Sequence, residues 1–173
     1  LDEPIEARNA SLPDLMVHGG RCAGISADGI QVSGDLFLRE GARIVGAIRL
    51  VGAHIAGNLE LGGVEIINTA GPALDLNGIQ VDGNVFLRQG VQITGNGGDG
   101  AVDLVCARIG KDLEFTDSEI TNGTGSAVRA DRVRVDGALF LFGEARFAGG
   151  DDAPAVSING ARSTNMGVTL DGA

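Results

Sequence analysis

The stretch GNVFL, residues 83–87, sets the pattern of this chain, because it returns as GDLFL at 34–38 and as GALFL at 137–141. Its last three residues form a triplet of apolar, variable and apolar positions, and such triplets recur from residue 36 to residue 170. A strand alternates its side chains between two faces. Each triplet therefore predicts a short strand with two inward apolar residues and one outward residue.

The triplets follow a regular period along the chain. Short and long steps alternate, and one of each makes a unit of 26 or 28 residues. Two units give a longer period, since Leu59 and Leu113 are 54 positions apart, as are Val85 and Leu139. Each unit holds three short alternating segments, and no apolar set keeps the i, i+3, i+4 spacing of a helix.

These features predict an all-β fold, a single-stranded parallel β-helix of about six coils. Parallel crossovers are right-handed in about 98 % of cases, so we expect a right-handed solenoid. Residues 1–30 lack regular triplets and are expected to form an irregular N-terminal cap on the solenoid, which then occupies residues 31–173.

The composition narrows the classes of partner. The formal net charge of −10 makes nucleic acid an unsuitable partner, because phosphate binding requires a basic stripe. Cys22 and Cys106 are far apart and have no CxxC motif, so we expect two buried thiols and neither a metal site nor a disulfide.

No apolar window is long enough for a membrane span, so we expect no direct membrane insertion by this segment. The chain begins with Leu1 and not with Met. We therefore expect an excised piece of a longer protein, with any anchor outside it. The compartment stays open between the cytoplasm and a membrane association through the missing flanks.

The outward residues of the first triplet in each unit are expected to stack into a column, because strands of successive coils lie side by side. Its candidate partner-binding residues are Phe37, Glu60, Phe86, Glu114 and Phe140, with Thr169 next in line. Two interpretations are open. Either each ring covers a neighbouring side chain or loop, or the rings form an exposed docking stripe for a second copy or another protein.

A second column is expected to contain Arg49, Asp75, Asp103, Arg129 and Ser157, and to form a solvated face. Asp75 and Asp103 would stack about 4.8 Å apart and repel, which a bound cation would relieve. The loop at 97–100 is similar to a calcium-binding nonapeptide, but its acidic residue comes one place too late. Asp99 and Asp103 are thus weak metal candidates, and we expect no metal and no cofactor.

The run GPALDLNGIQVDGNVFLRQG at 71–90 resembles bacterial repeat proteins with the pattern G-x-A-L-x-A-D-G-x-x-V-x-G-x-V-F-L-R-x-G. The likeness continues at 46–61, 104–115 and 130–143 and covers most of residues 30–170. It implies a pentapeptide-like β-helical domain of a larger bacterial protein. Members are labelled hypothetical protein or membrane-associated oxidoreductase. The sequence does not support the latter activity, because it has no redox cysteine pair and no GxGxxG at a strand-to-helix junction.

No grouping of side chains typical of catalysis is found, so we expect a non-catalytic structural or interaction module rather than an enzyme. Its partner would be a protein or a second copy of the chain. One alternative is a polysaccharide-active β-helix enzyme, which needs a cluster of Asp, Glu or Lys/Arg side chains within about 5–9.5 Å on one face. Another is an acidic mimic of DNA that inhibits a DNA-binding enzyme.

Overall fold

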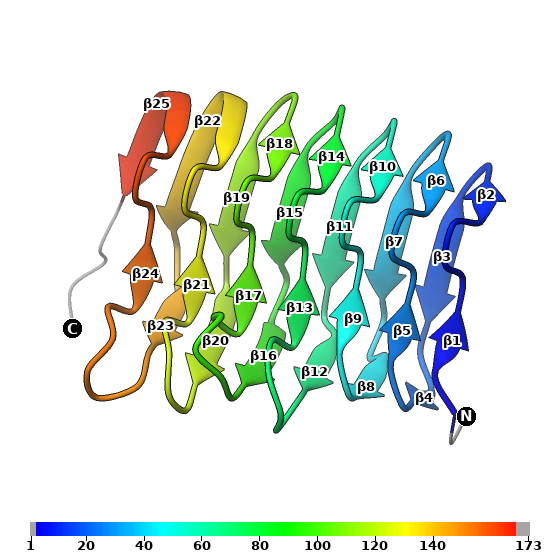
Figure 1. Cartoon of the computed structure of the whole chain (residues 1–173), viewed down its shortest axis with the longest axis horizontal. Coiled ribbons are helices and arrows are strands. Elements are labelled where there is room, and N and C mark those ends of the chain that lie inside the picture. The colour runs from blue at the N-terminus through cyan, green and yellow to red at the C-terminus, as the bar shows by residue number, and fades with distance from the viewer. Residues whose placement is uncertain (1–2, 169–173) are drawn as a thin grey trace.

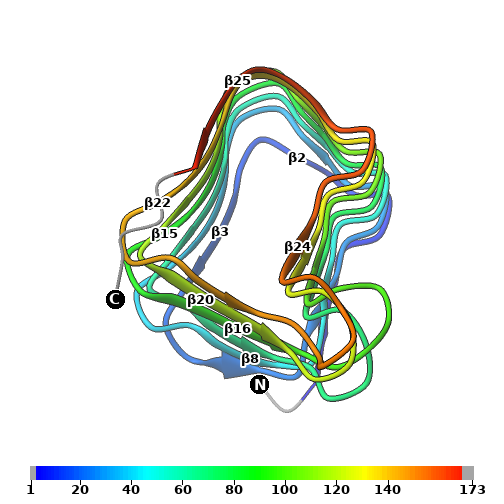
Figure 2. The ribbon, with the colours of Figure 1, turned by 90° about the vertical axis from the view of Figure 1, so that its left-hand side faces the viewer.

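The computed structural model describes residues 3–168, which wind into a parallel β-solenoid with three sheets (Figure 1). Sheet A has seven strands, so the chain makes six turns between the first and the last of them. Viewed from the C-terminal end, the chain runs counterclockwise as it approaches the viewer, which makes the solenoid right-handed (Figure 2). The predicted fold class is confirmed.

Sheet A stacks two-residue strands along the axis. In order they are β1 (Ile5–Glu6), β5 (Ile25–Ser26), β9 (Ile48–Arg49), β13 (Leu74–Asp75), β17 (Val102–Asp103), β21 (Val128–Arg129) and β24 (Val156–Ser157). Sheet C contains β4 (Arg21–Cys22), β8 (Arg43–Val45), β12 (Glu65–Ile67), β16 (Val91–Gly95), β20 (Ser118–Asn122) and β23 (Arg146–Ala148). Residues 3–168 include no helix that is both long and apolar enough to cross a bilayer.

Sheet B is bent, and most coils cross it with two strands (Figure 2). The first set is β2 (Ser11–Leu12), β6 (Gln31–Val32), β10 (His54–Ile55), β14 (Gln80–Val81) and β18 (Arg108–Ile109). The second set is β3 (Leu15–His18), β7 (Leu36–Arg39), β11 (Leu59–Gly62), β15 (Val85–Arg88) and β19 (Leu113–Thr116). The long strands β22 (Arg134–Phe142) and β25 (Arg162–Val168) pair with each other at the C-terminal end.

Each of these coils therefore has four strands, whereas the sequence predicts three. The additional strands are those of the first set in sheet B. Each is two residues long, and β6, β10, β14 and β18 each have one buried residue, such as Val32 or Val81. A two-residue strand is too short to show alternation. It contributes to the core without a detectable pattern in the sequence.

The expectation of an irregular cap at residues 1–30 is wrong. Strands β1 to β4 form a regular first coil, with Ile5 paired with Ile25 and Leu15 paired with Leu36. This coil is only 21 residues long from Leu15 to Leu36, because it has no loop between sheets C and A. The shorter spacing hides it from a search for a 26- or 28-residue unit.

The register at the C-terminal end also differs from the predicted one, in which Thr169 follows Phe140 in the column. Gly167, and not Thr169, is paired with Phe140. A register shift between Val135 and Ala138 in the pairing of β22 with β25 accompanies this change. Thr169 lies outside the described residues.

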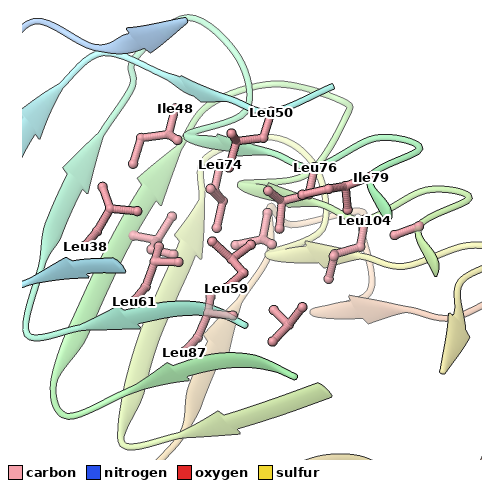
Figure 3. Packing of buried hydrophobic residues seen from close by; sticks show 14 of the residues in the cluster. Leu38, Ile48, Leu50, Leu59, Leu61, Leu74, Leu76, Ile79, Leu87 and Leu104 are labelled. Carbon is pink, nitrogen blue, oxygen red and sulfur yellow. The ribbon is translucent and has the colours of Figure 1, made fainter. Parts of the chain in front are cut away.

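The core consists of rows of aliphatic side chains that run along the axis. Leu38, Leu61 and Leu87 stack in successive coils, and Ile48 lies beside Leu74 (Figure 3). All five are at most 1 % exposed. Each such side chain stabilises the fold by about 1.5–3 kcal/mol relative to an exposed position.

Cys106 is exposed, which contradicts the expectation of two buried thiols, whereas Cys22 is buried. Cys106 occupies the turn that follows sheet A, at the position held by Gly52 and Gly78 in earlier coils. All three have positive φ, at 59°, 62° and 64°. A residue at this tight turn projects away from the core.

A ladder of Asp and Asn side chains runs along the bend of sheet B, just before each strand of the second set. We call it the Asx ladder; it consists of Asp14, Asp35, Asn58, Asn84 and Asp112. In each, Oδ1 accepts the backbone N–H of the equivalent residue one coil later, at 2.6–3.2 Å. The amides of Asn58 and Asn84 donate further bonds down the ladder.

The residue before the ladder position is usually glycine, and Gly83 shows why. A Cβ built there would lie 2.4 Å from the carbonyl oxygen of Gly57 and 2.7 Å from Oδ1 of Asn58. Both distances are too short for real atoms. The repeated Gly-Asx pair thus brings successive coils close enough for the ladder to form.

We predict that Asn58→Ala lowers the free energy of unfolding by about 1–3 kcal/mol, because it leaves the N–H and the side-chain amide of Asn84 without their acceptor. Urea unfolding followed by circular dichroism measures the change. Gln92→Ala is the control, since its side chain is exposed and outside the ladder, and we expect a change within about 0.5 kcal/mol. Equal effects of the two variants would contradict a stabilising role for the ladder.

Candidate functional site

The candidate partner-binding residues form one column on the outer face of sheet B, which we call the Phe/Glu column. Phe37, Glu60, Phe86, Glu114 and Phe140 occupy the same register position in successive coils. Met16 adds a further residue at the N-terminal end, where it is paired with Phe37, and is 54 % exposed. From Phe37 to Phe140, each Phe of the column is therefore adjacent to a Glu of the neighbouring coil.

Two rings of the column are covered by arginine side chains. The guanidinium of Arg39 lies over the ring of Phe37, 4.0 Å from its centre, and Arg88 lies over Phe86 at 4.4 Å. In both cases the Arg follows the Phe by two residues, so strand alternation places both on the same face. Stacking of this kind is worth about 0.5–2 kcal/mol per pair.

Both arginines bind the carboxylate between them. Oε2 of Glu60 is 2.9 Å from Nη2 of Arg39 and 3.1 Å from Nη2 of Arg88. The Glu60 side chain is only 8 % exposed. Gly62 lies between the two arginines in the register and has no side chain to separate them.

We call this group of Phe37, Arg39, Glu60, Phe86 and Arg88 the Phe-Arg-Glu cluster. Its rings are half-buried under planar guanidinium groups, which agrees with the interpretation that each ring is covered by a neighbouring side chain. Sequence reasoning missed the arginines, although FLR ends both 34–39 and 83–88. The third copy of the motif has Phe142 at that position. The Arg that follows Phe by two residues in the other two copies was thus a signal in the sequence for the ring-guanidinium pairs.

The second Glu of the column has a different environment. Glu114 Oε1 accepts a hydrogen bond from Thr116 Oγ1 at 2.8 Å, and its side chain is half-buried. No ion pair with an arginine is found for it among residues 3–168. The two carboxylates of the column are therefore held differently, Glu60 by two arginines and Glu114 by a neighbouring threonine.

The second predicted column, on sheet A, is not a solvated face. Asp75 and Asp103 are adjacent in the register and only 9 % and 3 % exposed. Arg49 Nη1 lies 3.0 Å from Oδ2 of Asp75, and Arg129 Nη2 lies 2.8 Å from Oδ2 of Asp103. The two stacked carboxylates are thus flanked by arginines, with Arg49 in the preceding coil paired with Asp75 and Arg129 in the following coil paired with Asp103.

The weak metal candidates meet at one of these arginines. Asp99 Oδ1 is 2.9 Å from Nη1 of Arg129, which also binds Asp103. Within residues 3–168, no group of three or more His, Cys, Asp or Glu side chains is arranged to hold a metal ion. The guanidinium of Arg129 takes the place in which the sequence suggested a cation.

Two carboxyl groups near sheet A have pKa values shifted in opposite directions. Burial raises the pKa of Asp75, against the opposing effects of the Asn77 N–H and of Arg49. A hydrogen bond from the Ser157 hydroxyl, at 2.7 Å, lowers the pKa of Asp131. Ionisation of Asp75 therefore destabilises the fold, whereas ionisation of Asp131 stabilises it.

Comparison of the chain with family models, with curated proteins and with solved structures finds no match in any of the three. What the site does must therefore be argued from its own geometry.

We predict that Glu60→Gln lowers the free energy of unfolding by about 2 kcal/mol, because it leaves two guanidinium groups without their shared carboxylate. Glu114→Gln is the matched control in the same column, and we expect a loss below about 1 kcal/mol. Thermal and urea unfolding of both variants test this. A smaller effect at Glu60 than at Glu114 would contradict the structural importance of the cluster.

We predict opposite pH dependences for Asp75→Asn and Asp131→Asn. A carboxyl group with a raised pKa favours folding while it is protonated, and that contribution is lost as the pH rises through the raised pKa. Relative to the parent, Asp75→Asn should therefore gain stability as the pH rises from about 3 to about 7. Asp131 has a lowered pKa, so its ionised form stabilises the fold at pH values above the usual pKa of an Asp side chain. Asp131→Asn should therefore lose stability, relative to the parent, as the pH rises from about 3 to about 7. Urea unfolding at several pH values measures both, and parallel curves would refute the assignment.

Proposed function

We propose that this chain is a non-catalytic interaction module, in which a rigid solenoid presents the Phe/Glu column to a protein partner. A second copy of the chain is the simplest such partner. The observation that carries the proposal is the fixed position of Arg39 and Arg88, each held between a ring and the buried Glu60.

The residue types of this face are those enriched at the centres of protein interfaces, namely aromatic residues, Met and Arg. Met16, Phe37, Arg39, Phe86 and Arg88 all retain exposed surface here. Long side chains normally lose conformational freedom on binding, at about 0.5–1.5 kcal/mol each. Arginines already fixed by Glu60 lose less, which supports binding by this face.

We also propose kinship with the bacterial pentapeptide-like repeat proteins that the sequence resembles, on the shared run that ends in V-F-L-R. The two other functions suggested by the sequence are less well supported. Asp75 and Asp103 are buried and paired with arginines, whereas a polysaccharide-active enzyme needs accessible carboxyl groups. A DNA mimic needs a continuous acidic stripe, whereas the columns described here interrupt their acids with Arg or Phe.

Chromatography with light scattering tests self-association. We expect the parent chain to be a dimer, and Phe37→Ser/Phe86→Ser/Phe140→Ser to be a monomer, because the substitutions remove the rings of the face. Since the triple variant also removes the ring-guanidinium stacks, Arg39→Lys/Arg88→Lys provides a milder variant. It keeps positive charge beside Glu60 but removes the planar surface, so it too should weaken the dimer.

Val45→Glu is the control, because Val45 is an exposed apolar residue of sheet C, on another face. It should leave the dimer intact. A monomeric parent chain would show self-association to be wrong, and a dimer that survives both column variants would exclude the column as the interface.

A further inference from the structure

Three exposed arginines occupy one register position in sheet B, at or in line with its first set of strands. The two sets of strands lie on either side of the bend of the sheet (Figure 2), so these arginines are separated from the Phe/Glu column. Arg108 in β18 is paired in register with Arg134 in β22, which is paired with Arg162 in β25. We call them the arginine ladder; adjacent strands place their backbones about 4.8 Å apart along the axis.

The ladder differs from the other arginine positions described above, because its charges are not neutralised. Arg39, Arg49, Arg88 and Arg129 each bind a carboxylate. None of Arg108, Arg134 and Arg162 is ion-paired within residues 3–168. Like charges directly opposite each other in a sheet are destabilising. Three such charges in a line, on a chain of net charge −10, form an unusual local concentration of positive charge.

A hollow of about 320 Å³ lies beside the ladder. Its polar lining consists of Arg108, Arg134, Gln80, Asp82 and Asp136. Gly110 also lines the hollow, next to Asp82, and adds no side chain to fill it. The hollow therefore combines positive groups with two carboxylates. Asp82 already binds Nε2 of Gln80 and Nε2 of His54, both at 2.9 Å, whereas no partner is found for the side-chain carboxylate of Asp136 within residues 3–168.

This combination distinguishes between anionic partners. Asp82, Asp136 and the net charge of the chain repel any anion, and they repel a polynucleotide most strongly because its phosphates form a dense, continuous row. An acidic peptide offers separated carboxylates for the arginines and, in addition, backbone N–H groups that can donate hydrogen bonds to Asp136. In an extended peptide, alternate residues point to one side, so its acidic side chains can face the ladder in a row.

We propose that the arginine ladder and its hollow bind an extended acidic segment of a partner protein, aligned with the solenoid axis. This surface is separate from the Phe/Glu column and does not depend on the function proposed for that column. The partner's carboxylates pair with Arg108, Arg134 and Arg162, and its backbone N–H groups face Asp136.

The test uses a fluorescein-labelled peptide of alternating Glu and Gly, and fluorescence anisotropy at low and at physiological salt. We expect the parent chain to bind it, and Arg108→Gln/Arg134→Gln/Arg162→Gln to bind about tenfold more weakly. The control Arg8→Gln/Arg43→Gln/Arg146→Gln removes the same charge from other positions and should bind within about twofold of the parent. Circular dichroism and thermal unfolding verify that both variants fold.

Two further probes identify the chemistry that is recognised. A peptide of alternating Gln and Gly, which lacks charge, should not bind, and labelled oligothymidylate should bind more weakly than the acidic peptide. The proposal is overturned if the acidic peptide does not bind, if both triple variants lose affinity equally, or if oligothymidylate binds more tightly. Since none of these substitutions lies in the Phe/Glu column, the oligomeric state reports separately on the function proposed there.

Discussion

Parallel stacking in register is the constraint on which the rest of this structure depends. Each residue lies beside the residue that holds the same position one coil earlier, as the pairing of Leu59 with Val85 and of Val85 with Leu113 shows. Inside the solenoid this arrangement is favourable, because aliphatic side chains pack in continuous rows. At the surface it has a disadvantage, since an outward charge that repeats in every coil meets its own kind about 4.8 Å away.

The outer columns avoid this repulsion in different ways. In the Phe/Glu column a ring separates successive carboxylates, and arginines two residues further along neutralise Glu60. On sheet A, two adjacent aspartates are each paired with an arginine on the outer side. Along the bend of sheet B, the Asx ladder directs each side-chain oxygen at an N–H of the next coil. The arginine ladder has none of these solutions, which is why we assign it an external partner.

The sequence predicted the features that depend on strand alternation and on a constant period. The parallel solenoid and the column members from Glu60 to Phe140 are of this kind, since they follow from positions 26 or 28 residues apart. The handedness follows from the general preference of parallel crossovers. Features that break the period were missed. The first coil is short, the strands of the first set in sheet B show no alternation, and a register shift in the pairing of β22 with β25 places Gly167 beside Phe140.

The chemistry of the candidate site was harder to predict, because it depends on which outward side chains fold back on the surface. Alternation places Arg39 beside Phe37, but it does not show that the guanidinium stacks on the ring and reaches Glu60 one coil away. The burial of Asp75 and Asp103 likewise depends on nearby groups such as Arg129, which the loop residue Asp99 also contacts. Such contacts join coils and cannot be read from one unit alone.

The two-coil alternation of the Phe/Glu column also determines how such a solenoid can grow by gene duplication. Copying one coil would place Phe beside Phe or Glu beside Glu, and a second buried carboxylate would then share the arginines that neutralise Glu60. Copying the 54-residue pair of coils preserves every neighbour relation in the column. The duplication unit that leaves the surface chemistry intact is therefore two coils, although the backbone repeats after one.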